Sequence, residues 1–227
     1  MKTMRIKRKI CTYNELVEVA TGENDEQLID VRNYDNRIIA HYEKMDMLPY
    51  TGEFIFVRDT VARKLATANA ALIKRDNLFL KIVYGYRHPD IQKMYFDKMR
   101  AKLKMIHLSL NDKELDALTH NFVAVPLVAG HPTGGAIDIT IVDTEGNVLD
   151  MGTDIADFSN PEKIKTFANG LSSAQKKNRL LLRDVLMNED FAPFYGEWWH
   201  FSYGDREWAC FYEKPASLYS PANFKIA

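Results

Sequence analysis

Apolar residues recur at helical spacing along the second quarter of the chain. The spacing predicts an amphipathic helix that begins near Thr60 and ends near Asn77. Its apolar positions are Val61, Leu65, Ala68 and Leu72. The apolar run that follows, residues 78–84, predicts a strand directly after this helix.

A second helix is predicted to begin at Pro89, because the missing N–H of proline is not needed in the first turn of a helix. The apolar stripe of this helix consists of Ile91, Tyr95, Met99, Leu103 and Ile106. We expect the helix to pack on the sheet. The first quarter of the chain has no clean period and is expected to form loops and short strands.

The clearest strand signal lies at residues 136–142, where isoleucines alternate with Ala136, Asp138 and Thr140. Residues 143–147 then predict a hairpin turn that leads into Val148 and Leu149. Ser172 and Gln175 form the signature of a helix-capping box, and the helix that they open is expected to end near Glu189. Residues 198–203 predict a last strand.

Together these elements predict an α+β fold, in which three or four helices pack around a small, mainly antiparallel sheet. The chain has 227 residues, and neither an internal repeat nor a linker rich in proline, glycine or serine divides it. We therefore expect one domain over residues 1–227.

The charge balance disfavours nucleic acid and anionic lipid surfaces as partners. Thirty basic residues against thirty-one acidic ones give a formal net charge of -1. The basic run from Lys2 to Lys9 is not followed by an apolar segment, so it does not resemble a secretory signal peptide. No apolar stretch of ~20 residues predicts a membrane span either. A small-molecule partner is expected, and self-association stays open.

The two cysteines, Cys11 and Cys210, lie far apart in the sequence and outside any C-x-x-C spacing. This pattern predicts neither a disulfide framework nor a thiolate zinc site. We expect two reduced, structural thiols, which in turn favour a cytoplasmic location.

The first candidate for chemistry is Asp138, because a carboxylate inside an isoleucine-rich strand is costly unless it has a partner. His131 lies seven residues upstream. The intervening segment, residues 132–135, contains proline and two glycines and is able to turn the backbone so that both side chains converge on one cation.

A catalytic zinc site takes about three protein ligands and leaves a position for water. The segment Glu197-Trp198-Trp199-His200 offers a third ligand, His200, together with a base, Glu197. Taken singly, each of these residues has a commoner structural explanation, such as a capping aspartate or a core histidine. Only a pattern that links them makes the set informative.

The pattern His131-x-x-Gly134-x-Ala136-x-Asp138, followed by Glu197-Trp198-Trp199-His200, resembles the signature of the VanX-like D-alanyl-D-alanine dipeptidases. Gly85-Tyr86-Arg87 resembles the arginine motif of this family of zinc D,D-peptidases. The resemblance spans roughly residues 80–203 and implies the D,D-peptidase/Hedgehog-like fold.

The resemblance implies a role for each matching residue. His131, Asp138 and His200 are the expected ligands of one zinc ion per chain, Glu197 the general acid/base, and Arg87 the stabiliser of the oxyanion. The implied activity is hydrolysis of D-alanyl-D-alanine or of a closely related small D,D-dipeptide.

Three departures from the family pattern put the substrate preference in doubt. Ala129 stands where the family usually has serine, His88 stands between Arg87 and Pro89, and Ala156 falls on a position that is commonly a carboxylate. The main alternative is therefore a zinc D,D-carboxypeptidase or endopeptidase that acts on peptidoglycan stem peptides. A zinc-stabilised binding module without catalysis is a further alternative, although Glu197 and Arg87 are both present.

Overall fold

The computed structural model describes residues 9–226, so most of the basic run from Lys2 to Lys9 lies outside the described residues. The structure is mixed α and β, which confirms the predicted fold class. A five-stranded sheet has the order β2-β4-β5-β7-β6, and all neighbouring strands are antiparallel except β2 and β4. Its strands are β2 (Ile39–Ala40), β4 (Phe79–Tyr84), β5 (Ala136–Val142), β6 (Ala192–Pro193) and β7 (His200–Ser202).

The first quarter of the chain contains short elements, as its irregular pattern predicts. Strands β1 (Leu28–Asp30) and β3 (Phe56–Arg58) form a separate antiparallel pair. The other elements are helix α1 (Tyr13–Glu18), the 3-10 turn η1 (Met45–Met47) and the short helix α2 (Leu48–Thr51).

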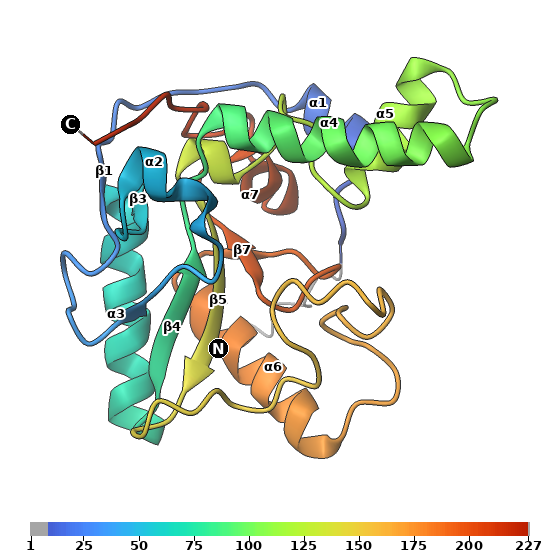
Figure 1. The fold of residues 1–227 in the computed structure, drawn as a ribbon. Helices are drawn as coiled ribbons and strands as arrows, with labels where there is room; N and C mark the ends of the chain where they lie inside the picture. Colours follow the sequence, from blue (N-terminus) through green and yellow to red (C-terminus); the bar gives the residue numbers. More distant parts are fainter. Residues whose placement is uncertain (1–8, 227) are drawn as a thin grey trace.

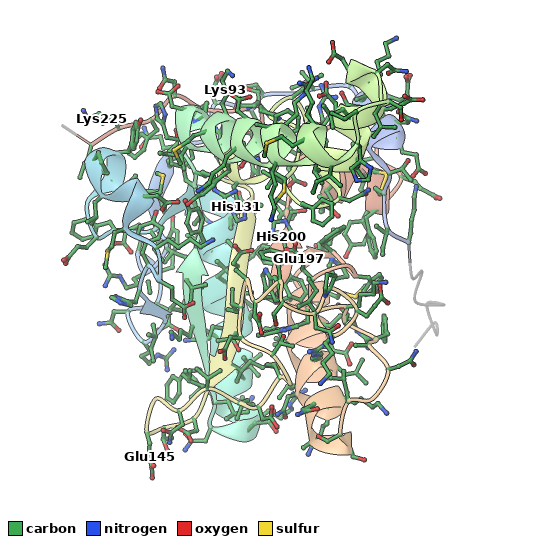
Figure 2. All side chains as sticks on the ribbon, turned by 45° about the vertical axis from the view of Figure 1, so that its right-hand side comes forward. Lys93, His131, Glu145, Glu197, His200 and Lys225 are labelled. Carbon is green, nitrogen blue, oxygen red and sulfur yellow. A yellow bond between two sulfur atoms is a disulfide. The ribbon has the colours of Figure 1, made fainter. Side chains whose placement is uncertain are left out.

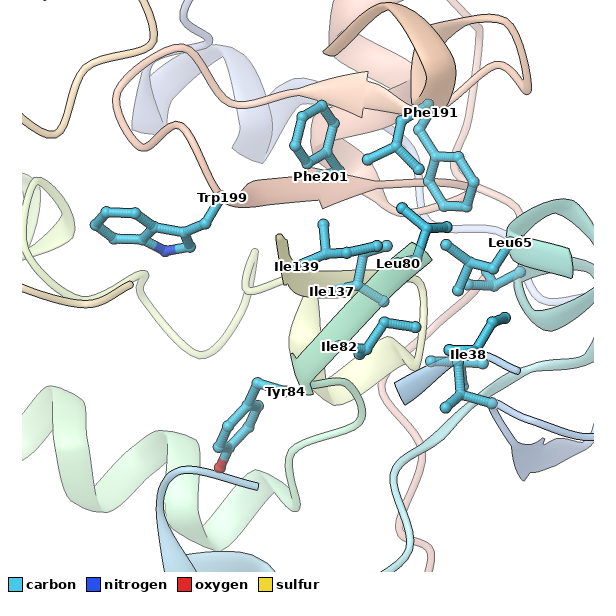
Figure 3. Packing of buried hydrophobic residues seen from close by; sticks show 14 of the residues in the cluster. Ile38, Leu65, Leu80, Ile82, Tyr84, Ile137, Ile139, Phe191, Trp199 and Phe201 are labelled. Atoms are coloured by element: carbon cyan, nitrogen blue, oxygen red, sulfur yellow. The ribbon is translucent and has the colours of Figure 1, made fainter. Parts of the chain in front are cut away.

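The main core lies between the sheet and two helices, α3 (Asp59–Asp76) and α6 (Ser173–Met187), which appear beside β4 and β5 in Figure 1. Ile137 and Ile139 of β5 are fully buried in this core, together with Leu65 of α3 (Figure 3). Burying one such side chain stabilises the fold by about 1.5–3 kcal/mol. Helix α3 ends where the sequence predicts, because Asn77 adopts the left-handed conformation that closes a helix.

The capping box of α6 is confirmed. The Ser172 hydroxyl accepts from the backbone N–H of Gln175, and the Gln175 side chain accepts from the backbone N–H of Ser172. The turn at residues 143–147 is also present, with the Asp143 carboxylate accepting from the backbone of Glu145 and Asn147. Val148 then forms only an isolated bridge to Val142. Strand β7 is shorter than predicted and begins at His200.

The second predicted helix forms as α4 (Pro89–Ile106), but the expectation that it packs on the sheet is wrong. Helix α4 lies across one end of the sheet and packs against α5 (Asp112–His120), as Figure 1 shows. Of the expected apolar stripe only Leu103 is buried, while Ile106 is 65% exposed. The physical reason is that the buried face of the helix includes Phe96, which packs in a small apolar cluster with Leu16 and Val128 and not on the sheet.

The prediction of two reduced thiols is also wrong, because Cys11 and Cys210 form a disulfide. The bond connects the segment before α1 to α7 (Arg206–Phe211), and α1 and α7 contact one another. Both cysteines are buried with Leu16 and Val128 in a small apolar cluster. The expected cytoplasmic location rested on reduced cysteines and loses that basis, since disulfides persist mainly in oxidising compartments. Among residues 9–226, no helix combines the length and the apolar character that a membrane span requires.

Candidate metal centre

His131, Asp138 and His200 meet at the end of the sheet that α4 covers. His131 opens the 3-10 turn η2 (His131–Thr133), and Asp138 of β5 is directly opposite His200 of β7. One donor atom from each side chain lies within 4.8 Å of the other two. In Figure 2 the labels of His131 and His200 lie close together below α4, with Glu197 next to them.

The turn between His131 and Asp138 brings their side chains together, as the sequence suggests. Gly134 has a φ of 73°, and a Cβ there would lie 2.2 Å from a methyl carbon of Leu28. Arg58 fixes the turn from outside, because its Nε donates to the Thr133 carbonyl at 2.7 Å. Glycine is therefore required at position 134 both for its backbone conformation and for space.

His131 is held in the form that binds a metal. Its Nδ1 lies 2.7 Å from the carbonyl oxygen of Gly85, and a carbonyl only accepts, so Nδ1 carries the proton. The other nitrogen, Nε2, is then unprotonated and lies 3.4 Å from Oδ2 of Asp138. Burial lowers the pKa of His131 to about 4, so the ring stays neutral. Such a backbone bond is typical of histidines that ligate zinc.

Asp138 and His200 form the charged half of the cluster. Their closest atoms, Oδ1 of Asp138 and Nδ1 of His200, are 2.9 Å apart. Burial alone raises the pKa of Asp138, but His131 and His200 overcome it and hold the pKa well below its usual value. Burial lowers the pKa of His200, and the bond to Asp138 raises it to about 9. Without a metal, one proton on His200 thus balances the buried carboxylate.

Two nitrogen donors and one carboxylate oxygen suit zinc. The cluster is largely buried, and a proton on His200 supplies its only positive charge in this arrangement. A divalent cation replaces that proton and satisfies the carboxylate at the same time. The residues present therefore fit a zinc ion.

Glu197 lies in the turn just before β7. Its backbone carbonyl accepts from the backbone N–H of His200 at 3.3 Å, so the two residues are connected through the main chain. Burial raises the pKa of Glu197 to about 7, although His200 nearby opposes the shift. Gly196 precedes it, and a Cβ there would lie 2.6 Å from the Phe194 ring. A carboxyl group that titrates near neutrality is able both to accept and to donate a proton.

Arg87 follows β4 and reaches the same end of the sheet. Its backbone N–H donates to the carbonyl of His131 at 3.1 Å. Its Nη1 donates to Oε1 of Gln92 at 2.8 Å, and the guanidinium carbon lies 4.5 Å from the centre of the Tyr84 ring. The structure thus brings all five predicted site residues to one region, with Arg87 close enough to Asp138 for their charges to interact.

The residues that depart from the family pattern lie in different surroundings. His88 is buried, accepts from the backbone N–H of Asp90 and bonds the side chain of Asn223, so both ring nitrogens are used structurally. It caps α4 and adds no free polar group to the site. Ala129 is buried, and Ala156 is partly buried in a loop and has a φ of 56°.

Sequence reasoning missed three parts of the site: the Gly85 carbonyl that orients His131, Asp46 behind Tyr84, and Glu207 of α7. Burial raises the pKa of Glu207 to about 8, with His200 opposing and Asp205 and Glu197 adding to the shift. The Gly85 contribution is a backbone carbonyl, which carries no side-chain signal, and neither Asp46 nor Glu207 belongs to a motif that the sequence shows.

Comparisons with known proteins identify a family profile and several related sequences. The sequence profile of the D-Ala-D-Ala dipeptidase family matches residues 37–219. The D-alanyl-D-alanine dipeptidase of Synechocystis sp. is 36% identical over 93 residues, which are 37% of this chain and 38% of the relative. The Escherichia coli (strain K12) enzyme of the same name is 35% identical over 79 residues, 35% of this chain and 40% of the relative. The matched segments thus span less than half of either relative.

Two solved structures are similar over most of their length. A VanY D,D-pentapeptidase in complex with Zn(II) has a TM-score of 0.45 and 17% identity. The match covers 90% of this chain and 96% of the VanY chain. The LdcB LD-carboxypeptidase has a TM-score of 0.47 and 18% identity, and the match covers 93% of this chain and 89% of the LdcB chain. Since the family profile covers most of the sequence, the chain belongs to the D-Ala-D-Ala dipeptidase family of metallopeptidases.

Proposed function

We propose that this protein is a zinc-dependent dipeptidase that hydrolyses D-alanyl-D-alanine or a closely related small D,D-dipeptide. The observation that carries the proposal is the convergence of His131, Asp138 and His200, in a chain that belongs to the D-Ala-D-Ala dipeptidase family. His131 Nε2, His200 Nδ1 and the Asp138 carboxylate are the proposed ligands of one zinc ion. Bound there, zinc supplies a Lewis acid and lowers the pKa of water to about 7.

Glu197 is the proposed general acid/base. Its carboxylate takes a proton from the water that attacks the peptide carbonyl carbon, and the same proton is then returned to the leaving amine as the C–N bond breaks. A pKa raised to about 7 by burial suits both steps near neutral pH.

Arg87 is the proposed electrophilic group. As the water attacks, negative charge develops on the carbonyl oxygen of the substrate, and a permanent cation with several N–H donors stabilises it. Its Nη1 donates to Gln92, while its Nε has no hydrogen-bond partner within the described residues. Donors of the guanidinium are therefore left for the substrate.

The dipeptide is favoured over longer stem peptides by the curated relatives, which carry the name of D-alanyl-D-alanine dipeptidases. His88 no longer argues for the longer substrates, since its ring is occupied by structural bonds. Ala129 remains a difference from the family pattern. The alternative, a D,D-carboxypeptidase or endopeptidase, is decided by the length of the peptide that the protein cleaves.

The test compares D-alanyl-D-alanine with an acylated pentapeptide that ends in D-Ala-D-Ala, at equal concentrations of zinc-loaded protein. Release of free D-alanine is measured for both, with Glu197→Gln as the control for contaminating peptidases. We expect kcat/KM for the dipeptide to exceed that for the pentapeptide by at least about tenfold, the discrimination of a pocket that excludes extra groups. A preference for the pentapeptide overturns the dipeptidase proposal in favour of the alternative.

A further inference from the structure

The guanidinium of Arg87 lies in a cage of two tyrosine rings. Its central carbon is 4.5 Å from the centre of the Tyr84 ring and 5.5 Å from that of Tyr95. Tyr84 ends β4, directly before the turn that carries Arg87, whereas Tyr95 lies on α4. Guanidinium groups stack well on aromatic faces because their charge is delocalised and weakly hydrated. Contacts with the two rings therefore set the position of the Arg87 guanidinium.

Asp46 connects these two rings through their hydroxyl groups. Both tyrosine hydroxyls donate to the same carboxylate oxygen, Oδ2 of Asp46, Tyr84 at 3.0 Å and Tyr95 at 2.5 Å. Asp46 lies on η1, more than thirty residues before either tyrosine, so this contact is tertiary. A single carboxylate thus fixes the orientation of two rings that belong to different elements.

The cage is close to the proposed metal ligands. The Tyr84 ring packs edge to face with the His131 ring at 5.3 Å between centres, and Tyr84 is paired with Asp138 across the two strands. A small rotation of the Tyr84 ring therefore changes the position of Arg87 relative to the ligands. Positioning within about 0.5 Å matters for groups that act on a transition state.

Charge supports the same arrangement. Among the described residues, Nε of Arg87 and Oδ1 of Asp46 are buried without a hydrogen-bond partner. Leaving either charge in the interior without a counter-charge is strongly unfavourable. The carboxylate of Asp46 supplies a negative charge that acts on Arg87 without a direct hydrogen bond between the two side chains.

We propose that Asp46 is a positioning residue for Arg87: it holds the two tyrosine rings against which the guanidinium packs, and so aims Arg87 at the substrate. The inference rests on the proposed function for its effect on hydrolysis, but the position of Arg87 is measurable by itself. Gln92 completes the support, because its amide is fixed by a bond to the Ala124 carbonyl at 2.8 Å.

The kinetic test uses Asp46→Asn, which keeps the size of the side chain and removes its charge, and the double variant Tyr84→Phe/Tyr95→Phe, which keeps both rings. We expect kcat for D-alanyl-D-alanine to fall about tenfold in each, with KM nearly unchanged, less than the 10²–10³-fold cost of losing a transition-state donor. The matched control is Tyr42→Phe, which removes the hydroxyl of a buried tyrosine that contacts the Tyr84 ring but bonds Thr51. It should behave as the wild type.

A rescue experiment separates positioning from general damage. In Arg87→Ala, millimolar guanidinium chloride should restore part of kcat by occupying the vacant cage, whereas urea, a neutral analogue, should not. In Asp46→Asn/Arg87→Ala the rescue should be several-fold weaker. Equal rescue in both backgrounds overturns the inference, as does a wild-type kcat in Asp46→Asn.

The position of Arg87 is followed directly by its Nε–H signal in ¹⁵N-labelled protein, identified by its loss in Arg87→Lys. We expect a sharp signal in the wild type and a shifted or broadened one in Asp46→Asn, with Tyr42→Phe unchanged. An identical signal in Asp46→Asn contradicts the inference. If wild-type protein with zinc releases no D-alanine, the proposed function fails, while this signal still decides whether Asp46 positions the arginine.

Discussion

Replacing Gly85 with alanine tests how the backbone supports the metal centre. A Cβ at this position would lie 2.6 Å from the carbonyl oxygen of Phe56 and 2.8 Å from Cγ2 of Ile55, both too close for any real contact. The neighbouring backbone is unable to move aside freely, because the N–H of Tyr86 donates to the same Phe56 oxygen at 2.7 Å. Gly85 must therefore shift, and its carbonyl shifts with it.

That carbonyl is the group that holds Nδ1 of His131 at 2.7 Å. Loss of an outer bond of this kind typically weakens zinc binding about 10–100-fold, which equals about 1.4–2.7 kcal/mol. The overpacking itself is expected to lower the free energy of unfolding by about 1–3 kcal/mol. Gly85→Ala should thus remain folded at room temperature while its zinc affinity falls.

The assay is competition for zinc with a chromophoric chelator, and urea unfolding of the metal-free protein gives the stability. Gly146→Ala is the matched control, because Gly146 has a φ of 84° and a Cβ there meets nothing within 4 Å. It should lose about 1–2 kcal/mol of stability through backbone strain and no zinc affinity. A folded Gly85→Ala protein with wild-type zinc affinity refutes the assigned role of the Gly85 carbonyl.

Three further outcomes are expected. Glu197→Gln should lower kcat about 10²–10⁴-fold with zinc content unchanged, by metal analysis of the purified variant, and full activity would remove Glu197 from the mechanism. Burial raises the pKa of Glu207 from 4.5 to about 8, so the folded state binds this proton more tightly and metal-free wild type loses stability as pH rises between these values. Glu207→Gln should lose less stability between pH 5 and pH 9 in urea titrations, and equal losses would contradict the burial of this carboxyl. Cys11→Ser should lower the unfolding free energy by about 2–5 kcal/mol. A reductant should lower the unfolding free energy of the wild type but not that of the variant.

The regular elements were predictable where local signals agree. The alternation of residues 136–142 yields β5, the Ser172 and Gln175 pair opens α6, and Asn77 closes α3. Helix α4 begins at Pro89 as predicted, but its predicted packing was wrong. Its stripe of apolar residues gives a helical period and does not say which face the rest of the chain covers.

The candidate site was predictable as a set of residues through the family pattern, and the structure brings that set together. Its convergence depends on the pairing of Asp138 with His200, a register between strands sixty-two residues apart that no local period encodes. The roles of the individual residues stay predictions.

The groups that support the site could not be predicted from the sequence, for a different reason. The Gly85 contribution is a backbone carbonyl, which carries no sequence signal, and Asp46 reaches the cage only through tertiary contacts. The disulfide joins cysteines 199 residues apart, and pairing at such a separation depends on the whole fold.

The most direct measurement of the central claim is release of free D-alanine from D-alanyl-D-alanine by zinc-loaded protein, with L-alanyl-L-alanine and chelator-treated protein in parallel. We expect release from the D,D-dipeptide alone, its loss with chelator and its return when zinc is added back. No release from D-alanyl-D-alanine by protein that holds one zinc ion per chain would contradict the account.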